Sequence, residues 1–248
     1  MQAAAKSGFD AIALDYDALW TETAIGMSQR LAVWERIDTL FQPGQFVLDI
    51  GCGTGADALH LESRGVNVYG VDNSASMVGV ARMRGVSAGF ISIGELNQIP
   101  ARFDGALSNF GALNCVPSLD DVAAALARKI CKGGYAALCF IGSFCAWETG
   151  YYLLRGQFRR AFRRRRSRVR SSLGIDVYYF SRRAILAAFR KNFRLAGTYG
   201  IGLFVPPSYV KGLDDRTVAR LTALDKYCAH WPLLRRMADH RLYIFERI

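Results

Sequence analysis

Residues 47–59, VLDIGCGTGADAL, decide the fold of this chain. Apolar and β-prone residues run up to Ile50, three glycines follow at alternate positions, and a helix-forming run begins at Ala56. A strand that passes through a glycine-rich turn into a helix presents free backbone N–H groups and lets a ligand approach the main chain closely. The stretch therefore predicts a ligand-binding strand–turn–helix unit.

Two ligand classes compete for this turn. With Ala56 in the last place, the glycines fit the dinucleotide pattern G-x-G-x-x-G/A, which is a weak signal by itself. Asp49, two residues before Gly51, favours another ligand, because its carboxylate would repel a pyrophosphate but attract an ammonium group. S-adenosylmethionine carries such an ammonium beside a carboxylate and a sulfonium. A nicotinamide cofactor stays open as the alternative.

The surrounding sequence alternates between the strand and helix periods. We expect strands over 46–50, 66–72, 89–93, 103–110, 135–143, 193–205 and 241–248. We expect helices over 56–65, 74–84, 119–134 and 181–192, and a helical region over 214–238. This rhythm predicts an α/β fold with a mostly parallel sheet, and the absence of repeats and linkers predicts one domain over 1–248.

The composition of the chain bears on its partners and on its place in the cell. The chain has 32 Lys and Arg against 21 Asp and Glu, a formal net charge of +11. Its six cysteines are scattered without a Cys-x-x-Cys pair, so we expect reduced thiols and no metal site. No signal-peptide pattern and no apolar run of membrane-spanning length is present, which predicts a cytoplasmic protein, with a peripheral membrane position as an alternative.

Four motifs in order resemble one family. Residues 40–142 contain VLDIGCGTG, VYGVDNSASM, GELNQIP and FDGALSNFGALNCVPSLDDV followed by KGG, and they resemble the core of the class I S-adenosylmethionine-dependent methyltransferases. The resemblance implies a three-layer, Rossmann-like seven-stranded sheet whose last strand is antiparallel. It also implies helical lid residues 1–40, a cofactor-binding core 41–142, an insertion 143–180 over the acceptor pocket and a C-terminal part of the sheet, 181–248.

The resemblance also implies roles for single residues. Asp72 would bind both ribose hydroxyls of S-adenosylmethionine, Asp49 its ammonium through water, and Glu95 its adenine amino group. S-adenosylhomocysteine would be the product. The full set of cofactor contacts expected in this way is Tyr16, Asp49, Gly51, Cys52, Gly53, Gly55, Asp72, Asn73, Met77, Gly94, Glu95, Leu96, Ser108, Asn109 and Phe110.

The chemistry makes few demands on the protein. A sulfonium methyl is already electrophilic, so alignment of the acceptor and exclusion of water can supply most of the acceleration. A base is needed only where the acceptor must lose a proton. Tyr151, Tyr152 and His240 are candidates for the pocket wall or for that base, and Asn114, Trp147 and Glu148 are expected in the acceptor pocket. No base is assigned from the sequence.

Segment 145–170 is both aromatic and basic. Its spacing predicts one helix with Trp147, Tyr151, Leu154, Phe158 and Phe162 on one face and nine arginines of 155–170 on others. The arginines would form a solvated face above a pocket cap, or would contact an anionic membrane or an acidic carrier. Nucleic acid is not expected, because SNFGALNCVP lacks the Asn/Asp-Pro-Pro-Tyr tetrapeptide and no RNA-binding module is visible.

The favoured function is methyl transfer to a small hydrophobic or aromatic acceptor. An RNA or protein methyltransferase that uses the arginines, a membrane-surface lipid methyltransferase, and a protein that binds the cofactor without turnover are the alternatives. The sequence does not predict the oligomeric state.

Overall fold

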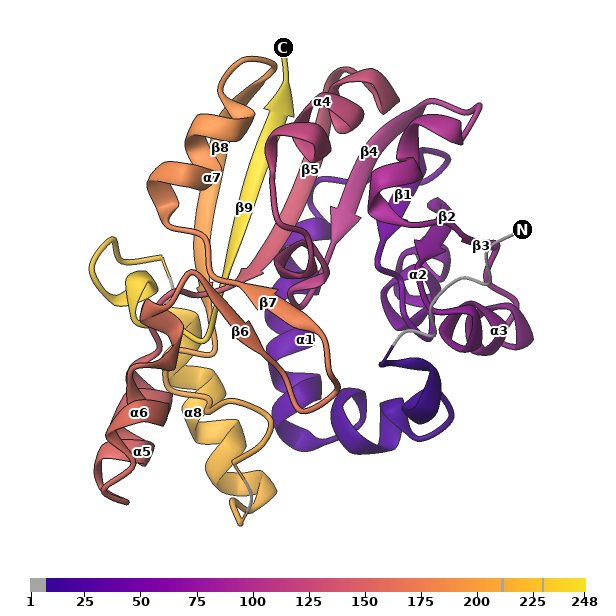
Figure 1. Cartoon of the computed structure of the whole chain (residues 1–248). Helices are drawn as coiled ribbons and strands as arrows, with labels where there is room; N and C mark the ends of the chain where they lie inside the picture. Colours follow the sequence, from indigo (N-terminus) through magenta and orange to yellow (C-terminus); the bar gives the residue numbers. More distant parts are fainter. Residues whose placement is uncertain (1–7, 211, 229) are drawn as a thin grey trace.

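The computed structural model describes residues 8–210, 212–228 and 230–248. A central seven-stranded sheet is covered by helices on both faces (Figure 1). Its strands are β1 (Phe46–Ile50), β2 (Asn67–Asp72), β3 (Ala88–Phe90), β4 (Phe103–Ser108), β5 (Ile130–Ile141), β8 (Phe193–Ile201) and β9 (His240–Arg247). A separate two-stranded sheet is formed by β6 (Arg168–Arg170) and β7 (Asp176–Tyr178).

The helices follow the strands in the alternating order that the sequence predicts. They are α1 (Ala24–Ile37), α2 (Ala56–Glu62), α3 (Ala75–Met83), α4 (Asp120–Lys129), α5 (Ala146–Leu153), α6 (Phe158–Ala161), α7 (Arg182–Phe189) and α8 (Asp215–Cys228). Short helical turns are η1 (Asp10–Ile12), η2 (Asp17–Thr21), η3 (Ile93–Gln98), η4 (Ala112–Cys115), η5 (Arg163–Arg165) and η6 (Leu234–Arg236).

The strand order is β3-β2-β1-β4-β5-β9-β8. Strands β1 to β5 are parallel, whereas β9 is antiparallel to both β5 and β8. The expected Rossmann-like sheet with an antiparallel last strand is therefore confirmed. The order reverses between β1 and β4, and in open α/β sheets ligands bind outside the carboxyl ends of the strands at such a point.

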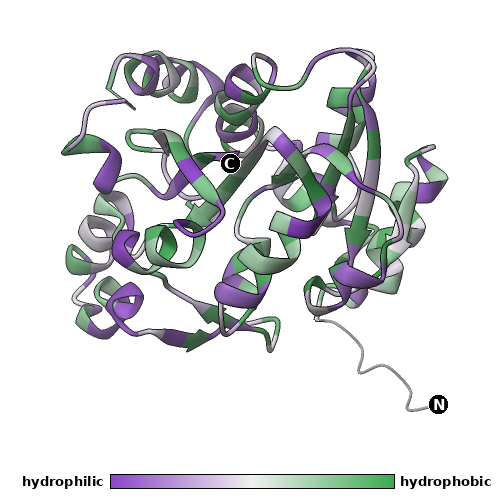
Figure 2. Cartoon of the chain, turned by 90° about the horizontal axis from the view of Figure 1, so that it is seen from above, coloured by the Kyte–Doolittle hydropathy of each residue, from purple (hydrophilic) through white to green (hydrophobic). Residues whose placement is uncertain are grey.

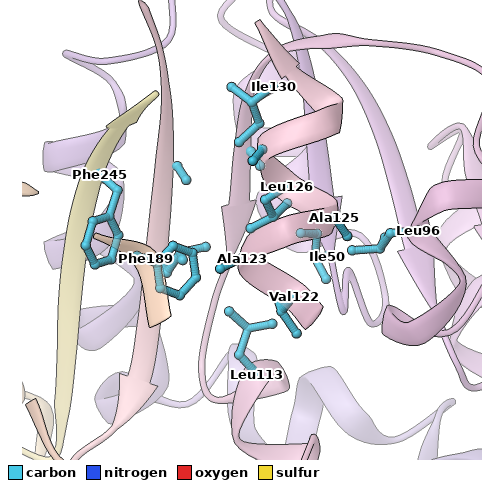
Figure 3. Close-up of a cluster of buried hydrophobic side chains, with 14 of the residues drawn as sticks. Ile50, Leu96, Leu113, Val122, Ala123, Ala125, Leu126, Ile130, Phe189 and Phe245 are labelled. Carbon is cyan, nitrogen blue, oxygen red and sulfur yellow. The ribbon is translucent and has the colours of Figure 1, made fainter. Parts of the chain in front are cut away.

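Each face of the sheet has its own buried cluster. One cluster contains Val122 and Leu126 of α4 and Phe189 of α7, packed on Ile50 and Phe245 (Figure 3). The other cluster places α1, α2 and α3 against the opposite face. Seen from above, the strands are mostly hydrophobic and the surrounding helices mix hydrophobic and hydrophilic residues (Figure 2). This pattern is that of a sheet buried on both faces.

The helix expected over 119–134 is shorter than predicted. α4 ends at Lys129, and Ile130 already pairs with Phe103 as the first residue of β5. Ile130 is buried and β-branched, so it contributes more to the sheet than to a further helical turn. The paired glycines that were expected to end the helix lie inside the strand, with Gly133 at φ 82°.

The single helix expected over 145–170 is wrong. The chain forms α5, turns at Gly156 with φ 68°, forms the short α6 and η5, and continues as the hairpin β6–β7. The predicted faces are also reversed in part. Leu154 and Phe158 are 90% and 65% exposed, whereas Arg164 is buried.

Within the described residues, no helix is long and apolar enough to cross a membrane.

Candidate functional site

A cavity of about 290 Å³ opens at the carboxyl ends of β1, β2 and β4. Its walls come from the glycine turn 51–54, from Asp72 and Asn73 after β2, and from Asn109 and Phe110 after β4. Met77 of α3 also lines it. The switch point of the sheet and the predicted glycine turn thus meet in one cavity.

The glycine turn depends on backbone that other residues rarely adopt. Gly51 and Gly53 have φ values of 72° and 54°. A Cβ on Gly51 would lie 2.2 Å from the Cβ of Ala112, whereas a Cβ on Gly53 would meet no protein atom within 4 Å. Gly55, at φ 84°, is the N-cap of α2 and does not line the cavity. A side chain at position 51 would therefore collide with Ala112, whereas the space beside Gly53 is free of protein atoms.

Asp72 presents a carboxylate to the same cavity. Its Oδ2 accepts a hydrogen bond from the Gly53 N–H at 2.9 Å, and its Oδ1 accepts one from the Ser74 N–H at 2.8 Å. Burial raises the pKa of Asp72, and the backbone N–H groups of Ser74 and Gly53 oppose that rise. Each oxygen retains a further lone pair, so the carboxylate can also accept from ligand hydroxyls.

Charges of both signs lie behind the glycine turn. Asp49 is buried, and its Oδ2 has no hydrogen-bond partner. Burial raises the pKa of Asp49 well above its usual value, Asp57 adds to the rise and Arg30 opposes it. Arg30 pairs with Asp57 at 2.5 Å and lines the cavity, yet its Nε has no partner. Asp49 itself does not line the cavity, so of these two residues with an unpaired atom only Arg30 belongs to the cavity wall.

The N-terminal segment closes over this site. Asp17 accepts a hydrogen bond from the Thr54 hydroxyl at 2.8 Å and forms an ion pair with Arg84 at 2.5 Å. Asp10 accepts from the Ser74 hydroxyl at 2.6 Å. Tyr16, between these two contacts, lines the cavity as predicted. Residues 1–7 of the expected lid lie outside the described residues.

A second cavity of about 140 Å³ adjoins the first. The two cavities share Tyr16, Arg30 and Phe110 as walls, and Trp20 and His240 line the second. The His240 ring meets Phe110 edge to face, with centroids 5.4 Å apart, and its Nδ1 lies 3.2 Å from Asp239. His240 is therefore beside the first cavity, as one of the sequence candidates.

Several expected cofactor contacts do not line the first cavity. Glu95 is exposed and turns back to Ser92 in a capping box, and Leu96 is buried in the core. Gly94 is also absent from the wall, where Ile91 and Ile93 lie instead. The Ser108 hydroxyl is buried and donates to the carbonyl of Ile50. None of these four expected contacts lines the cavity, and neither does Asp49.

The predicted acceptor residues have structural partners instead. Asn114 is buried and donates to the carbonyl of Tyr178 at 2.6 Å, while its own oxygen accepts from the Ile141 N–H. The Trp147 indole N–H donates to the carbonyl of Phe204. Neither residue lines the two cavities.

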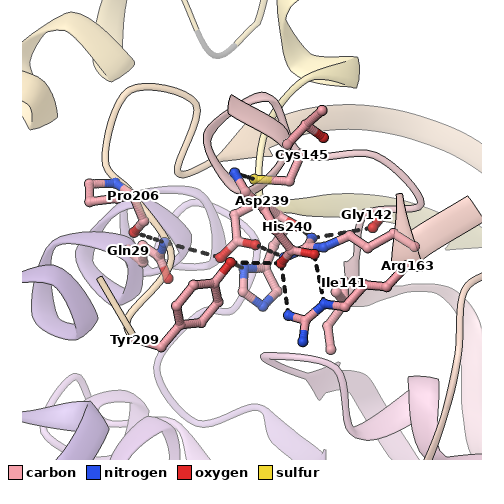
Figure 4. Close-up of polar contacts among 12 residues, drawn as sticks. Gln29, Ile141, Gly142, Cys145, Arg163, Pro206, Tyr209, Asp239 and His240 are labelled. Carbon is pink, nitrogen blue, oxygen red and sulfur yellow. Dashed lines mark hydrogen bonds and ion pairs between the residues drawn. The ribbon is translucent and has the colours of Figure 1, made fainter. Parts of the chain in front are cut away.

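Glu148 anchors the insertion rather than the acceptor pocket. Its carboxylate is buried and accepts from Arg163, from Arg164 and from the Tyr209 hydroxyl. Figure 4 shows Arg163, Tyr209, Asp239 and His240 close together in this polar network. Burial alone would raise the pKa of Glu148, but Arg163 and Arg164 outweigh it and hold that pKa below its usual value.

Tyr151 and Tyr152 also lie outside the cavities. Both rings pack near Tyr209, and the Arg155 guanidinium lies 3.7 Å from the Tyr151 ring centroid. The structure therefore does not bring these two candidates together with His240.

The structure adds residues that sequence reasoning missed. Arg30, Asp57 and Ile175 line the first cavity. Ile175 comes from the turn of the β6–β7 hairpin, so the insertion reaches this cavity by its hairpin rather than by a helix. Of these three residues, only Asp57 could have been suspected from the sequence, because it lies two positions after Gly55 of the glycine turn.

The thiols of the cavity are part of its wall. Burial raises the pKa of Cys115 to about 11 and that of Cys52 further, so both stay neutral near pH 7. All six cysteines are free. In the part of the chain that the structure describes, no three His, Cys, Asp or Glu side chains gather as metal ligands would.

Residues 48–138 match the family described as a methyltransferase domain. A ubiquinone biosynthesis O-methyltransferase from Dechloromonas aromatica is 37% identical over 114 residues, which are 42% of this chain and 49% of that protein. A demethylmenaquinone methyltransferase from Beutenbergia cavernae is 32% identical over 117 residues, 45% and 47% of the two chains. This chain thus spans about half the length of these curated relatives.

The fold similarity extends further than the sequence similarity. An S-adenosylmethionine-dependent methyltransferase from Thermotoga maritima, described as a possible histamine N-methyltransferase, superposes with a TM-score of 0.61. The superposition covers 97% of this chain and 99% of the Thermotoga maritima protein. The two sequences are 18% identical, so the similarity is evidence for the fold alone.

Proposed function

We propose that this chain, a class I S-adenosylmethionine-dependent methyltransferase by its fold and by the sequence of its core, transfers a methyl group to a small aromatic acceptor. When bound, S-adenosylmethionine supplies an electrophilic methyl group on its sulfonium. The larger cavity at the β1/β4 switch point would hold the cofactor, and the adjoining smaller cavity would hold the acceptor.

One observation carries the choice of cofactor. The buried Asp49, two residues before Gly51, has an unpaired Oδ2, and Arg30, which lines the cavity, has an unpaired Nε. Together they are complementary to an amino-acid zwitterion, with its ammonium and its carboxylate. A pyrophosphate would gain from Arg30 but would be repelled by Asp49 and Asp57, so the dinucleotide alternative fits this charge pattern less well.

The residues of the chain would bind and orient the cofactor and shield it from water. Asp72 would accept hydrogen bonds from the ribose hydroxyls, and the N–H groups of the glycine turn would lie against the amino-acid half. Tyr16, held by the contacts of Asp17 with Thr54 and Arg84, would keep water out. These roles favour catalysis mainly by alignment and desolvation.

The smaller cavity favours an aromatic acceptor. Tyr16, Trp20, Phe110 and His240 give it aromatic walls. Arg30 at its border would favour an acceptor with anionic character. One relative is named a ubiquinone biosynthesis O-methyltransferase and another a demethylmenaquinone methyltransferase, which supports a ring-bearing acceptor such as a phenol or a quinol.

His240 is the side chain best placed to accept a proton from such a hydroxyl. The Asp239 carboxylate lies 3.2 Å from the His240 Nδ1, although that nitrogen has no hydrogen-bond partner. His240 and Arg164 outweigh burial and hold the pKa of Asp239 far below its usual value, so Asp239 stays ionised. His240 would then act only for acceptors that lose a tightly held proton.

The test is methyl transfer from isotopically labelled S-adenosylmethionine to a panel of phenols and hydroxylated quinols. We expect transfer to at least one of them, and a rate that falls on acidification. His240→Gln should lower kcat by about 10²–10⁴-fold and remove that pH dependence, while the dissociation constant of S-adenosylhomocysteine stays unchanged.

Tyr151→Phe is the matched control, because its ring lies outside both cavities. Transfer to RNA or protein but to no small molecule would contradict the proposal. An unchanged pH profile in His240→Gln would remove its role as a base.

A further inference from the structure

A second feature of the molecule shares no lining residue with the two cavities of the proposed methyltransferase site. An open groove of about 940 Å³ runs between α7 and the segment that leads into β9. Its charged walls are Arg182, Arg183, Arg190, Arg236 and Arg241, and the rest are apolar or small: Phe144, Ser181, Leu186 and Ala187. We call this surface the basic groove.

The arginines of the basic groove have no acidic partners among the described residues. No Asp or Glu lines the groove, and none of its five guanidinium groups takes part in an ion pair within the ranges 8–210, 212–228 and 230–248. Arg163 and Arg164, by contrast, are bound to Glu148. The groove is thus a surface where five arginines without an ion pair meet and no acidic residue offsets them.

Arg241 is the unusual member of the groove. Its side chain is buried, with the residue only 8% exposed. One terminal nitrogen donates to the carbonyl of Arg236 at 3.0 Å, and its Nε has no partner. A buried charge without a counterion is costly, and an anion bound in the groove would supply that counterion.

The start of α7 gives a second, independent sign. Arg182 and Arg183 occupy its first turn, after the N-cap Ser181, whose hydroxyl accepts from the Ala184 N–H. The helix macrodipole places partial positive charge there and favours acidic residues, so two arginines with no acid oppose it. A local arrangement that costs stability in this way marks a functional surface.

We propose that the basic groove binds a ligand that carries two or more linked phosphate groups. Each planar guanidinium group can donate two parallel hydrogen bonds to the oxygens of a phosphate. Five arginines carry more positive charge and more donors than a single carboxylate could neutralise or accept. Free backbone N–H groups at the start of α7 would add to the same site. Arg241 follows His240 at the start of β9, so the two side chains lie on opposite faces of the sheet. The phosphates therefore bind outside the methyltransferase cavity.

The experiment uses the full chain and pyrophosphate as the probe. We expect pyrophosphate to raise the melting temperature and to bind by calorimetry at constant ionic strength, whereas sulfate at the same ionic strength has a weaker effect. Arg182→Gln/Arg183→Gln should weaken pyrophosphate binding by about tenfold or more. Arg216→Gln/Arg220→Gln removes the same charge from exposed positions on α8, outside the groove, and should bind like the wild type.

Arg241→Met separates a ligand role from a structural one. Without ligand, its melting temperature should equal or exceed that of the wild type, because a costly buried charge is removed, while pyrophosphate binding is lost. A lowered melting temperature together with unchanged pyrophosphate binding would contradict the proposal.

Two further arms identify the source of the phosphate. Sedimentation with phosphatidylcholine vesicles, with and without phosphatidic acid, tests a lipid headgroup. Groove-dependent binding of pyrophosphate alone indicates a soluble ligand, and groove-dependent sedimentation with phosphatidic acid indicates a membrane surface. Equal losses in the α8 control pair, or no binding in either arm, would overturn the proposal.

Discussion

At the scale of single residues, Gly51 and Gly53 share positive φ but have different neighbours. A Cβ on Gly51 would collide with Ala112, whereas a Cβ on Gly53, which also lines the cavity, would meet no protein atom within 4 Å. The pair therefore separates the packing of the turn from the binding of a ligand.

Gly51→Ala should destabilise the fold, since overpacking costs about 1–3 kcal/mol and a left-handed alanine about 1–2 kcal/mol more. Gly53→Ala should lose only the about 1–2 kcal/mol of stability that a left-handed alanine costs. It should nevertheless bind S-adenosylhomocysteine more weakly, because the new methyl group is added to a residue of the cavity wall. Urea unfolding and calorimetry on both variants check this. Wild-type affinity in Gly53→Ala would contradict the placement of the cofactor.

Asp72 and Glu95 form a second informative pair. Asp72→Asn should weaken binding of S-adenosylhomocysteine by about 1.5–3 kcal/mol, the range for hydrogen bonds to a charged group. Glu95→Gln should leave the affinity unchanged, because Glu95 is exposed and bonded to Ser92. Titration calorimetry with S-adenosylhomocysteine on both variants measures this difference. A larger loss of affinity in Glu95→Gln than in Asp72→Asn would contradict it and would support the adenine contact that the sequence predicted for Glu95.

At this scale, the sequence pointed to one acid of the cavity wall but not to the arginine beside it. Asp72 could be predicted because it stands at a strand end, at a fixed distance from the glycines, whereas Asp49 and Glu95, predicted from the same motifs, do not line the cavity. Arg30 could not be predicted, because a single arginine in the middle of a helix gives no sign of its pairing with Asp57, 27 positions later. Only the packing of α1 on the sheet brings the two together.

At the scale of elements, the insertion shows where periodicity fails. Positions three and four apart predicted one helix, but Gly156 ends its first part, and a buried acid attracts the arginines that were expected to face solvent. The pairing of Glu148 with Arg163 and Arg164 spans 15 and 16 positions, beyond the reach of a helical pattern. The sheet, in contrast, follows short local signals and was predicted strand by strand.

Glu148→Gln should destabilise the protein by about 3–5 kcal/mol, because it leaves two arginines with an uncharged partner. The pKa of Glu148 is lowered in the folded state, so its contribution to stability is present above the ordinary carboxyl pKa of about 4.3 and is lost as pH falls below it. The variant should therefore lose less stability on acidification than the wild type, as measured by urea unfolding across pH. Asp176→Asn, an acid paired with arginines on the surface of the same insertion, should change little.

At the scale of the whole molecule, the basic residues that give the chain its +11 charge differ in their surroundings. Some are bound internally by Glu148 and Asp239, some pair with Asp176 on the hairpin, and five line the basic groove without an ion pair. The sequence predicted that the arginines of 155–170 would carry any contact with a membrane or carrier. The structure directs attention to arginines of α7 and of the approach to β9, which no run of sequence marks.

The most direct test of the central claim is a thermal titration of the full chain with S-adenosylhomocysteine, S-adenosylmethionine and NADH in parallel. A ligand that binds the folded state at 100 times its dissociation constant adds about 2.7 kcal/mol to the free energy of unfolding. We predict a rise in melting temperature with the first two ligands and none with NADH. A rise with NADH alone, or no response to S-adenosylhomocysteine, would contradict the assignment of the cavity at the glycine turn.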